Sequence, residues 1–331
     1  MRYDMSLPWW AWALMGAGLV AFIIMVAASI RRNNGVKRSL FAAPYTLWMI
    51  IFTIVPVVLI GYYAFTDASG AFTLDNFRNF WDSNFAKNQL YASLGPEAAA
   101  YITRGTVNED TLVYSLWMAF LCTVICLLLG YPAALFMADR NMKLGSSLVV
   151  LFIIPMWMNF LLRTIAWMSL LEDQGLINQF LRWLGFEGVH LMYNSSAVLL
   201  GMVYNFLPFM VFPIYTVLSK QDPKLGEAAQ DLGCNEIKTF TKVTLPLSLP
   251  GVISGITMVF MPAVTTFYIS RLLGGGKIQL FGDLIEAKFL STSLTEWNVG
   301  SALSLVMMVL ILLSLGLLQK VDPDGEGGGM V

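Results

Sequence analysis

Few residues of this 331-residue chain have the types and spacing that catalysis or cofactor binding requires. The pair Gly276 and Lys277 suggests a phosphate-binding loop, but Arg271 stands where that loop needs its first glycine and Ile278 where it needs serine or threonine. The only histidine, His190, has no second ligand at metal-binding spacing, so we interpret it as a surface residue. No combination of serine, histidine and aspartate suggests a hydrolase. The sequence therefore predicts no catalytic residue, no metal site and no cofactor bound by this chain.

The composition indicates a membrane protein. Hydrophobic residues make up 57% of the chain, charged residues only 12%, and the mean hydropathy is +0.68. Globular domains carry about twice that charge, and the net charge of −1 gives no indication of a nucleic-acid partner. A bilayer is crossed by about 20 apolar residues in a helix. Seven segments meet this length: Trp9–Ile30, Pro44–Phe65, Leu112–Ala138, Ser147–Leu171, Ala197–Ser219, Leu249–Leu272 and Gly300–Leu318.

Positive charges predict how these seven segments are oriented. The first segment is followed by a basic cluster, Arg31 to Arg38, whereas a cleaved signal peptide carries its basic residues before the apolar core. Loops on the Arg31 side hold most of the other basic residues, and such loops face the cytoplasm. We therefore expect the N-terminus outside, and the C-terminus and loop 220–248 in the cytoplasm.

No aspartate or glutamate falls inside the seven segments. Ion-driven carriers usually need buried acids as relays or ion ligands, although backbone carbonyls can sometimes replace them. A polytopic protein with neither an ATP loop nor relay acids is either passive or takes its energy from a partner. The second option requires a docking surface on the cytoplasmic side.

The stretch EAAQDLGCNEIKTFTKVTLP, residues Glu227–Pro246, offers such a surface. Asp222 and Pro223 are typical of a helix start, and Gly233 is typical of a helix end. Asn235 can cap a second short helix. The spacing places four residues on one apolar face of the first helix: Leu225, Ala228, Ala229 and Leu232. Periodicity alone leaves two interpretations open, a hairpin packed on its own bundle and a hairpin that docks a partner.

The spacing within this stretch resembles that of permease subunits of bacterial ABC importers. That family carries Glu-Ala-Ala, then three residues, a glycine, nine residues and Ile-x-Leu-Pro. This chain has the same order, with valine in place of isoleucine, and the resemblance implies that the loop is the coupling helix held in a cleft of a cytoplasmic ATPase. The coupling residues would be Glu227, Ala228, Ala229, Gly233, Leu245 and Pro246.

From Phe41 to Gln319 the chain looks like the B-type permease of spermidine/putrescine importers. The implied fold is the type I importer permease, all-α and polytopic, with six core transmembrane helices plus one extra N-terminal helix. The domains would be 1–39, the extra helix and its basic linker, then 40–320, the permease, and 321–331, a Gly-rich cytoplasmic tail. The motifs that carry this resemblance are TLDNF (73–77), IPMWMNFLLRTIAW (154–167), GLIN (175–178), GMVYNFLPFMVFPIY (201–215) and LLGGGK (272–277).

The resemblance also implies the partners and the location. The chain would lie in the bacterial plasma membrane, its lipid bilayer, with a cytoplasmic ABC ATPase dimer, a second permease and an extracytoplasmic polyamine-binding protein. ATP and Mg would bind the ATPase, so this subunit would not be an enzyme. Alternatives are a permease for another small solute, such as an iron complex, an anion or an amino-acid derivative, or a membrane subunit that transports nothing.

Aromatic side chains are the candidates for the path of a polyamine. A cation can be held over aromatic faces, each contributing about 0.5–2 kcal/mol, although most aromatics in membrane spans serve packing or lie at the interface. Arg163 would repel a cation and is interpreted as an anchor between helices. The candidate path residues are Trp157, Tyr204, Phe267 and Tyr268 in the spans, with Asp283 and Glu286 at the outer mouth.

Overall fold

The computed structural model describes residues 45–81, 108–139 and 145–321, and the predicted span Trp9–Ile30 lies outside these ranges. Within them the chain is helical apart from turns, loops and one isolated bridge between Thr66 and Phe72. The all-α prediction is therefore confirmed. The described residues form two compact units, one with residues up to Asn79 and 291–307, the other with 80–290 and 308 onward.

Among the described residues, five helices are long and apolar enough to cross a membrane, and a bent helix pair makes a sixth if it counts as one span. These six correspond to six of the seven predicted spans. Their bounds are Tyr45–Ala64, Asp110–Ala138, Ser195–Lys220, Glu236–Val264 and Leu294–Leu317, with Leu148–Trp157 and Phe160–Trp183 as the bent pair.

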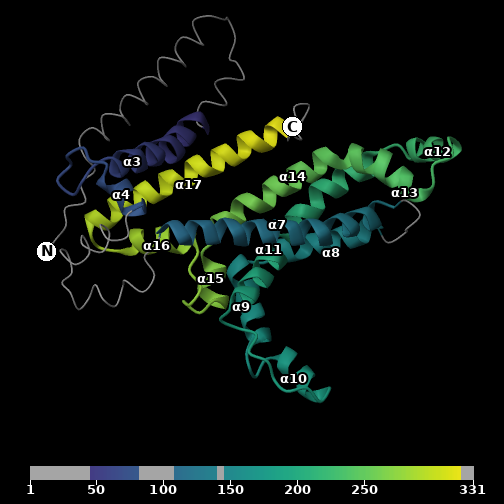
Figure 1. Cartoon of the computed structure of the whole chain (residues 1–331), viewed down its shortest axis with the longest axis horizontal. Helices are drawn as coiled ribbons and strands as arrows, with labels where there is room; N and C mark the ends of the chain where they lie inside the picture. Colours follow the sequence, from purple (N-terminus) through teal and green to yellow (C-terminus); the bar gives the residue numbers. More distant parts are fainter. Residues whose placement is uncertain (1–44, 82–107, 140–144, 322–331) are drawn as a thin grey trace, which may run out of the picture. The chain divides into compact units, whose positions relative to one another are not determined.

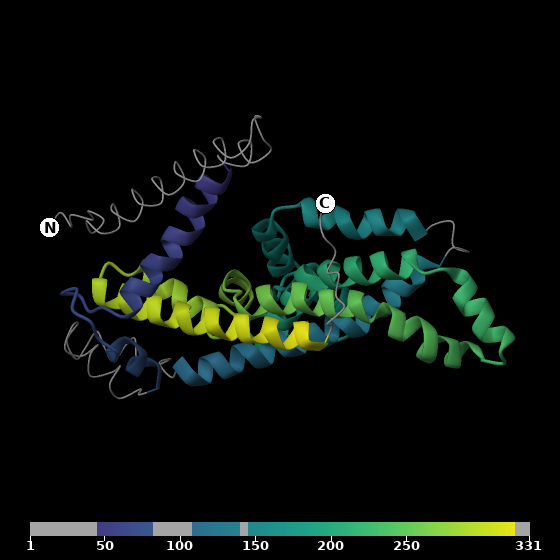
Figure 2. The ribbon, with the colours of Figure 1, turned by 90° about the horizontal axis from the view of Figure 1, so that it is seen from above.

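The larger unit is built on three long helices, α7 (Asn108–Ala138), α11 (Ser195–Lys220) and α14 (Leu245–Val264) (Figures 1 and 2). Met202, Met210 and Ile214 of α11 are fully buried. This unit also contains shorter helices: α8 (Gly145–Trp157), α9 (Phe160–Leu171), α10 (Leu176–Trp183), α12 (Pro223–Asp231), α13 (Glu236–Thr239), α15 (Tyr268–Leu273) and α16 (Phe281–Leu290).

Two glycines let α14 approach α11 closely. A Cβ atom at Gly251 would lie 3.0 Å from the Pro213 carbonyl oxygen and 3.1 Å from Ile214 Cα, and one at Gly255 would lie 3.1 Å from the Met210 carbonyl oxygen. Because the two glycines are four residues apart, they share a face of α14, as small residues do where membrane helices pack backbone to backbone.

The predicted span Ser147–Leu171 is not one straight helix. It divides into α8 and α9, and the two arms of the bent pair meet at 100°. Pro155 lies in the last turn of α8, and Asn159 begins α9 by accepting a hydrogen bond from the Leu161 amide at 2.8 Å. Proline cannot donate the helical hydrogen bond, and an asparagine cap favours a new helix start.

The predicted span Leu249–Leu272 was wrong at both ends. The helix begins at Glu236 and ends at Val264, and α15 follows as a separate short helix. Pro246 has no amide hydrogen, and its ring would crowd the Lys242 carbonyl in a regular α-helix. At this point the helix widens into the short π-helix η3 (Phe240–Thr244). The second short helix predicted from the sequence is therefore the first turn of the span.

The smaller unit contains η1 (Ile50–Ile54), α3 (Val55–Ala64), α4 (Asp75–Trp81) and the first part of α17 (Leu294–Val321). Asn76 is buried, and its Nδ2 donates to the carbonyl oxygens of Ala64 at 3.0 Å and Thr66 at 2.8 Å. The TLDNF motif thus closes the end of α3, which is a structural role.

Candidate functional site

The stretch predicted to dock a partner forms a helical hairpin of α12 and α13 at the far end of the larger unit from α16 (Figure 1). Asp222 Oδ1 accepts a hydrogen bond from the Lys224 amide at 3.0 Å, and Asn235 Oδ1 accepts one from the Lys238 amide at 2.9 Å. Both predicted caps are confirmed, and Pro223 is the first residue of α12. Each helix start is therefore fixed locally by the sequence.

Gly233 ends α12, as predicted. Its φ of +86° is left-handed, its amide donates to the Gln230 carbonyl at 2.8 Å, and the Cys234 amide donates to the Ala229 carbonyl at 3.0 Å. These two bonds form a Schellman motif. A side chain in this conformation costs about 1–2 kcal/mol, so the turn favours glycine.

The four residues predicted to share a face divide into two groups. Ala229 is 8% exposed and lies inside the hairpin, where α12 contacts α13 and η3. Leu225, Ala228 and Leu232 are exposed, and Leu232 is 87% exposed. Ala229 is not available to a partner, because its methyl group is already buried in the hairpin.

Ile237 of α13 is 73% exposed and adds to the apolar surface that α12 presents. We call these four residues the docking surface: Leu225, Ala228, Leu232 and Ile237. Glu227 is exposed beside them. Neighbouring apolar side chains exposed on a helix end are typical of a protein–protein contact.

The hairpin is tied to α7 through Tyr131. The Tyr131 ring meets the Phe240 ring edge-on at 5.9 Å, and its hydroxyl lies 2.8 Å from Ser248 Oγ. The sequence analysis did not identify Tyr131, because 109 positions separate it from Phe240 and its span shows only apolar character. Leu245 and Pro246 begin α14, directly after η3, and their role in coupling stays a prediction.

An open groove of about 560 Å³ lies beside the hairpin, bounded by the end of α7, the end of α11 and the π-helix η3. Phe136 and Leu135 are exposed on the α7 side. Leu218 and Gln221 line the α11 side, and Thr244 lines the η3 side. This hollow is continuous with the hairpin and enlarges the surface that a partner could cover.

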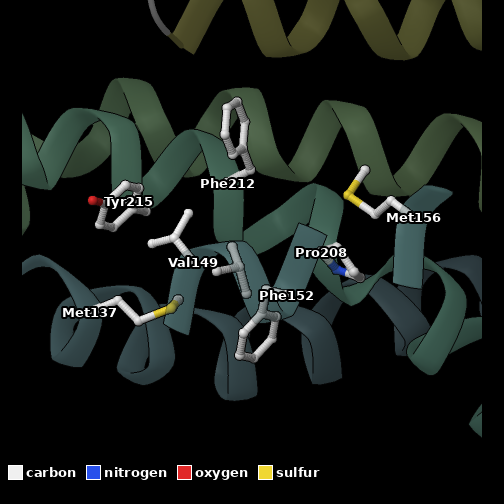
Figure 3. A pocket seen from close by; sticks show the side chains of 8 residues that line it. Met137, Val149, Phe152, Met156, Pro208, Phe212 and Tyr215 are labelled. Atoms are coloured by element: carbon white, nitrogen blue, oxygen red, sulfur yellow. The ribbon is translucent and has the colours of Figure 1, made fainter. Parts of the chain in front are cut away.

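A pocket inside this unit offers much less space. Figure 3 shows an apolar pocket between α7, α8 and α11, lined by Met137, Phe152, Met156, Phe212 and Tyr215 among others. Its volume is about 10 Å³, which is close to the minimum for one water molecule. This pocket is too small for a solute.

The acidic residues predicted at the outer mouth make internal contacts. Asp283 is buried, and its Oδ2 accepts hydrogen bonds from Ser270 Oγ at 2.5 Å and from the Leu280 amide at 2.8 Å. Burial raises the pKa of the Asp283 carboxyl to about 6, although these hydrogen bonds oppose the shift. Glu286 pairs with Arg271 at 2.6 Å. Their role toward a cation stays a prediction.

The aromatic candidates do not form one cluster. Phe267 and Tyr268 lie together, with ring centroids 4.3 Å apart, at the start of α15. Tyr204 packs edge-on against Trp167 at 5.1 Å. Trp157 ends α8 and is 84% exposed. Trp157 is therefore free to meet a solute or another chain, whereas Tyr204 also has a packing role.

His190 lies at the surface, as predicted, whereas the cysteines and Arg163 are more buried. The His190 side chain is 88% exposed, with Nδ1 2.9 Å from an Asp173 carboxylate oxygen. Cys122 and Cys126 are fully buried in α7, and Cys234 is half-buried in the hairpin. Arg163 of α9 is buried, and its Nε and Nη1 have no hydrogen-bond partner among the described residues.

Comparisons with known proteins agree with these features. Residues 130–324 match the family model described as "Binding-protein-dependent transport system inner membrane component". The spermidine/putrescine transport system permease protein PotB of Escherichia coli (strain K12) is 37% identical over 276 residues, which is 81% of this chain and 91% of that protein. The protein of the same name from Haemophilus influenzae is 34% identical over 289 residues, 85% of this chain and 92% of that one.

A solved structure shows the same fold. It is a bacterial alginate ABC transporter in complex with an alginate pentasaccharide-bound periplasmic protein. One of its chains superposes with a TM-score of 0.66 at 16% identity, covering 90% of this chain and 98% of that chain.

Proposed function

Because this chain belongs to the family of binding-protein-dependent transport system inner membrane components, it is a membrane-spanning transport subunit, and we propose that it serves ATP-driven polyamine import. It would form half of the translocation path for spermidine or putrescine. The observation that carries the proposal is the match, over more than 80% of this chain, to two proteins named as spermidine/putrescine permeases.

The energy for transport would come from a cytoplasmic ATPase dimer seated on the α12–α13 hairpin. The support is the docking surface, whose leucines and isoleucine are exposed at the end of a capped, rigid hairpin. Tyr131 would transmit a movement of the hairpin to α7, because its ring contacts Phe240 of the π-helix η3 and its hydroxyl contacts Ser248 of α14. ATP and Mg would bind the ATPase, and this chain would bind no cofactor.

The other half of the path would come from a second permease, and an extracytoplasmic protein would deliver the polyamine. The pocket inside α7, α8 and α11 is too small for a solute, so a path formed between two permeases fits the structure better. The similar alginate transporter is solved with a periplasmic protein bound, which supports the second partner.

Uptake by the reconstituted complex tests the substrate. Vesicles holding this chain, its second permease and its ATPase should accumulate radiolabelled spermidine or putrescine when given the binding protein and ATP. Trp157→Ala should lower uptake about two- to thirtyfold, the range that loss of one cation–π contact allows. Trp157→Phe keeps an aromatic face and should retain most uptake. If the wild-type vesicles take up no polyamine, the substrate assignment fails.

One observation favours a different solute. Arg163 is buried with two nitrogen atoms unpaired among the described residues, and a guanidinium suits a carboxylate or another anion. An anionic solute would also explain why the predicted spans contain no acid. In the same vesicles, uptake of an anion in place of polyamine, abolished by Arg163→Gln, would establish this alternative.

The orientation is part of the proposal: hairpin and C-terminus in the cytoplasm, N-terminus outside. Cys234 should react with a membrane-impermeant maleimide in inside-out vesicles and not in right-side-out vesicles. Cys122 and Cys126 are fully buried and should react only after denaturation. The Cys234→Ser variant gives the background. Labelling of Cys234 in right-side-out vesicles would reverse the topology.

A further inference from the structure

The short helix α10 presents an apolar face that no described residue of its unit covers. Leu176, Phe180 and Trp183 lie on this face, since they are three or four residues apart, and they are 65%, 58% and 79% exposed. The Phe180 and Trp183 rings stack with centroids 5.9 Å apart. Phe186, just after the helix, is 64% exposed. We propose that this face inserts into the membrane–water interface, on the side of the bilayer opposite the α12–α13 hairpin.

Hydrogen bonds of the Asn178 side chain fix the direction in which this apolar face points. Asn178 is fully buried, and its side chain bonds the Glu172 carbonyl at 3.1 Å, the Val189 carbonyl at 3.0 Å and the Val189 amide at 2.9 Å. These bonds tie the turn before α10 to the loop after it. The face therefore cannot rotate inward to bury its rings without breaking all three bonds.

The end of α10 is shaped in the same way. Gly185 has a φ of +87°, its amide donates to the Arg182 carbonyl at 3.0 Å, and the Phe186 amide donates to the Leu181 carbonyl at 3.0 Å. This Schellman motif turns the chain sharply. It holds Phe186 close to the helix and extends the apolar surface beyond its last turn.

The order of the helices along the chain places α10 on one side of the membrane and the hairpin on the other. α11 is long and apolar enough to cross a bilayer. α10 precedes the start of α11 and α12 follows its end, so the two lie on opposite sides.

Lipid is the occupant that best fits the chemistry of the face. Exposed apolar residues continue on α9, which belongs to a candidate membrane span, at Leu161, Leu162 and Ile165. Tryptophan and phenylalanine rings are typical of the boundary between head groups and acyl chains. The charged residues Glu172, Asp173 and Glu187 lie in the exposed loops around α10, outside this face.

Spin labels at neighbouring residues of α10 test the proposal. In the full-length chain with its three cysteines replaced by alanine, Phe180→Cys places a nitroxide on the face. Gln179→Cys places one beside it on an exposed polar position. In phosphatidylethanolamine and phosphatidylglycerol vesicles, we expect the Phe180 label to collide mainly with oxygen and the Gln179 label mainly with a water-soluble nickel chelate.

Two outcomes would overturn the proposal. Equal access of the nickel chelate to both labels would place the face in water. Shielding of the Phe180 label from both oxygen and nickel would mean that a protein covers it. The same shielding in the assembled complex would likewise overturn the proposal. Leu176→Cys, one turn earlier on the face, should behave as Phe180→Cys does, and it carries the test if the latter variant does not fold.

Discussion

Replacing Ala228 with tryptophan should detach the permease from its ATPase while the permease itself stays folded. Ala228 is exposed on the docking surface, so the indole would meet nothing in its own hairpin and would occupy space that the ATPase needs. Added volume in a packed interface costs about 1–3 kcal/mol, and each 1.4 kcal/mol is about a tenfold loss of affinity. We expect ATPase recovery with the purified permease to fall about tenfold or more, and uptake to fall with it.

Ala229→Trp is the matched control, because the same substitution one residue later points into the hairpin. Ala229 is buried, so the indole must displace α12 from α13. We expect less folded permease in the membrane, measured as monodisperse protein in mild detergent. Normal ATPase recovery and normal uptake in Ala228→Trp would show that the ATPase does not contact this face.

Gly251→Leu should strongly impair folding by separating α14 from α11. The Cβ alone would lie 3.0 Å from the Pro213 carbonyl oxygen and 3.1 Å from Ile214 Cα. These are backbone atoms of a buried helix and cannot move aside as a flexible side chain can. We expect a loss of about 3 kcal/mol or more in stability and a strong decrease in the monodisperse fraction on size exclusion.

Gly316→Leu controls for the added bulk and apolarity. Gly316 lies in α17, and a Cβ there would have no heavy atom within 4 Å. This variant should be recovered at the wild-type level. Equal recovery of the two variants would mean that the backbone contact between α14 and α11 is not required for the fold.

Some predictions succeeded because short segments decide them. The caps at Asp222 and Asn235 and the left-handed turn at Gly233 depend on hydrogen bonds between residues two to five positions apart. Six apolar segments became helices because a bilayer crossing needs only length and apolarity. The family resemblance in the hairpin followed from spacing that the sequence displays directly.

Other predictions failed because they depend on how helices turn and meet. A helical wheel placed Ala228 and Ala229 on one face, but the hairpin buries one and exposes the other. The span predicted to end at Leu272 ends at Val264, and the span predicted over Ser147–Leu171 bends by 100°. Hydropathy does not detect these breaks, because the sequence on both sides of each is rich in apolar residues.

By itself the sequence determined the class of protein, an all-helical membrane permease, and the caps of its two short helices after α11. The tertiary structure alone decided which of its residues are free to meet another molecule. Asp283 accepts a hydrogen bond from Ser270, and Glu286 forms an ion pair with Arg271. The apolar face of α10 stays exposed because Asn178 hydrogen-bonds Val189 in the loop after the helix. The physical reason is that exposure depends on contacts between residues distant in the chain, which local periodicity does not encode.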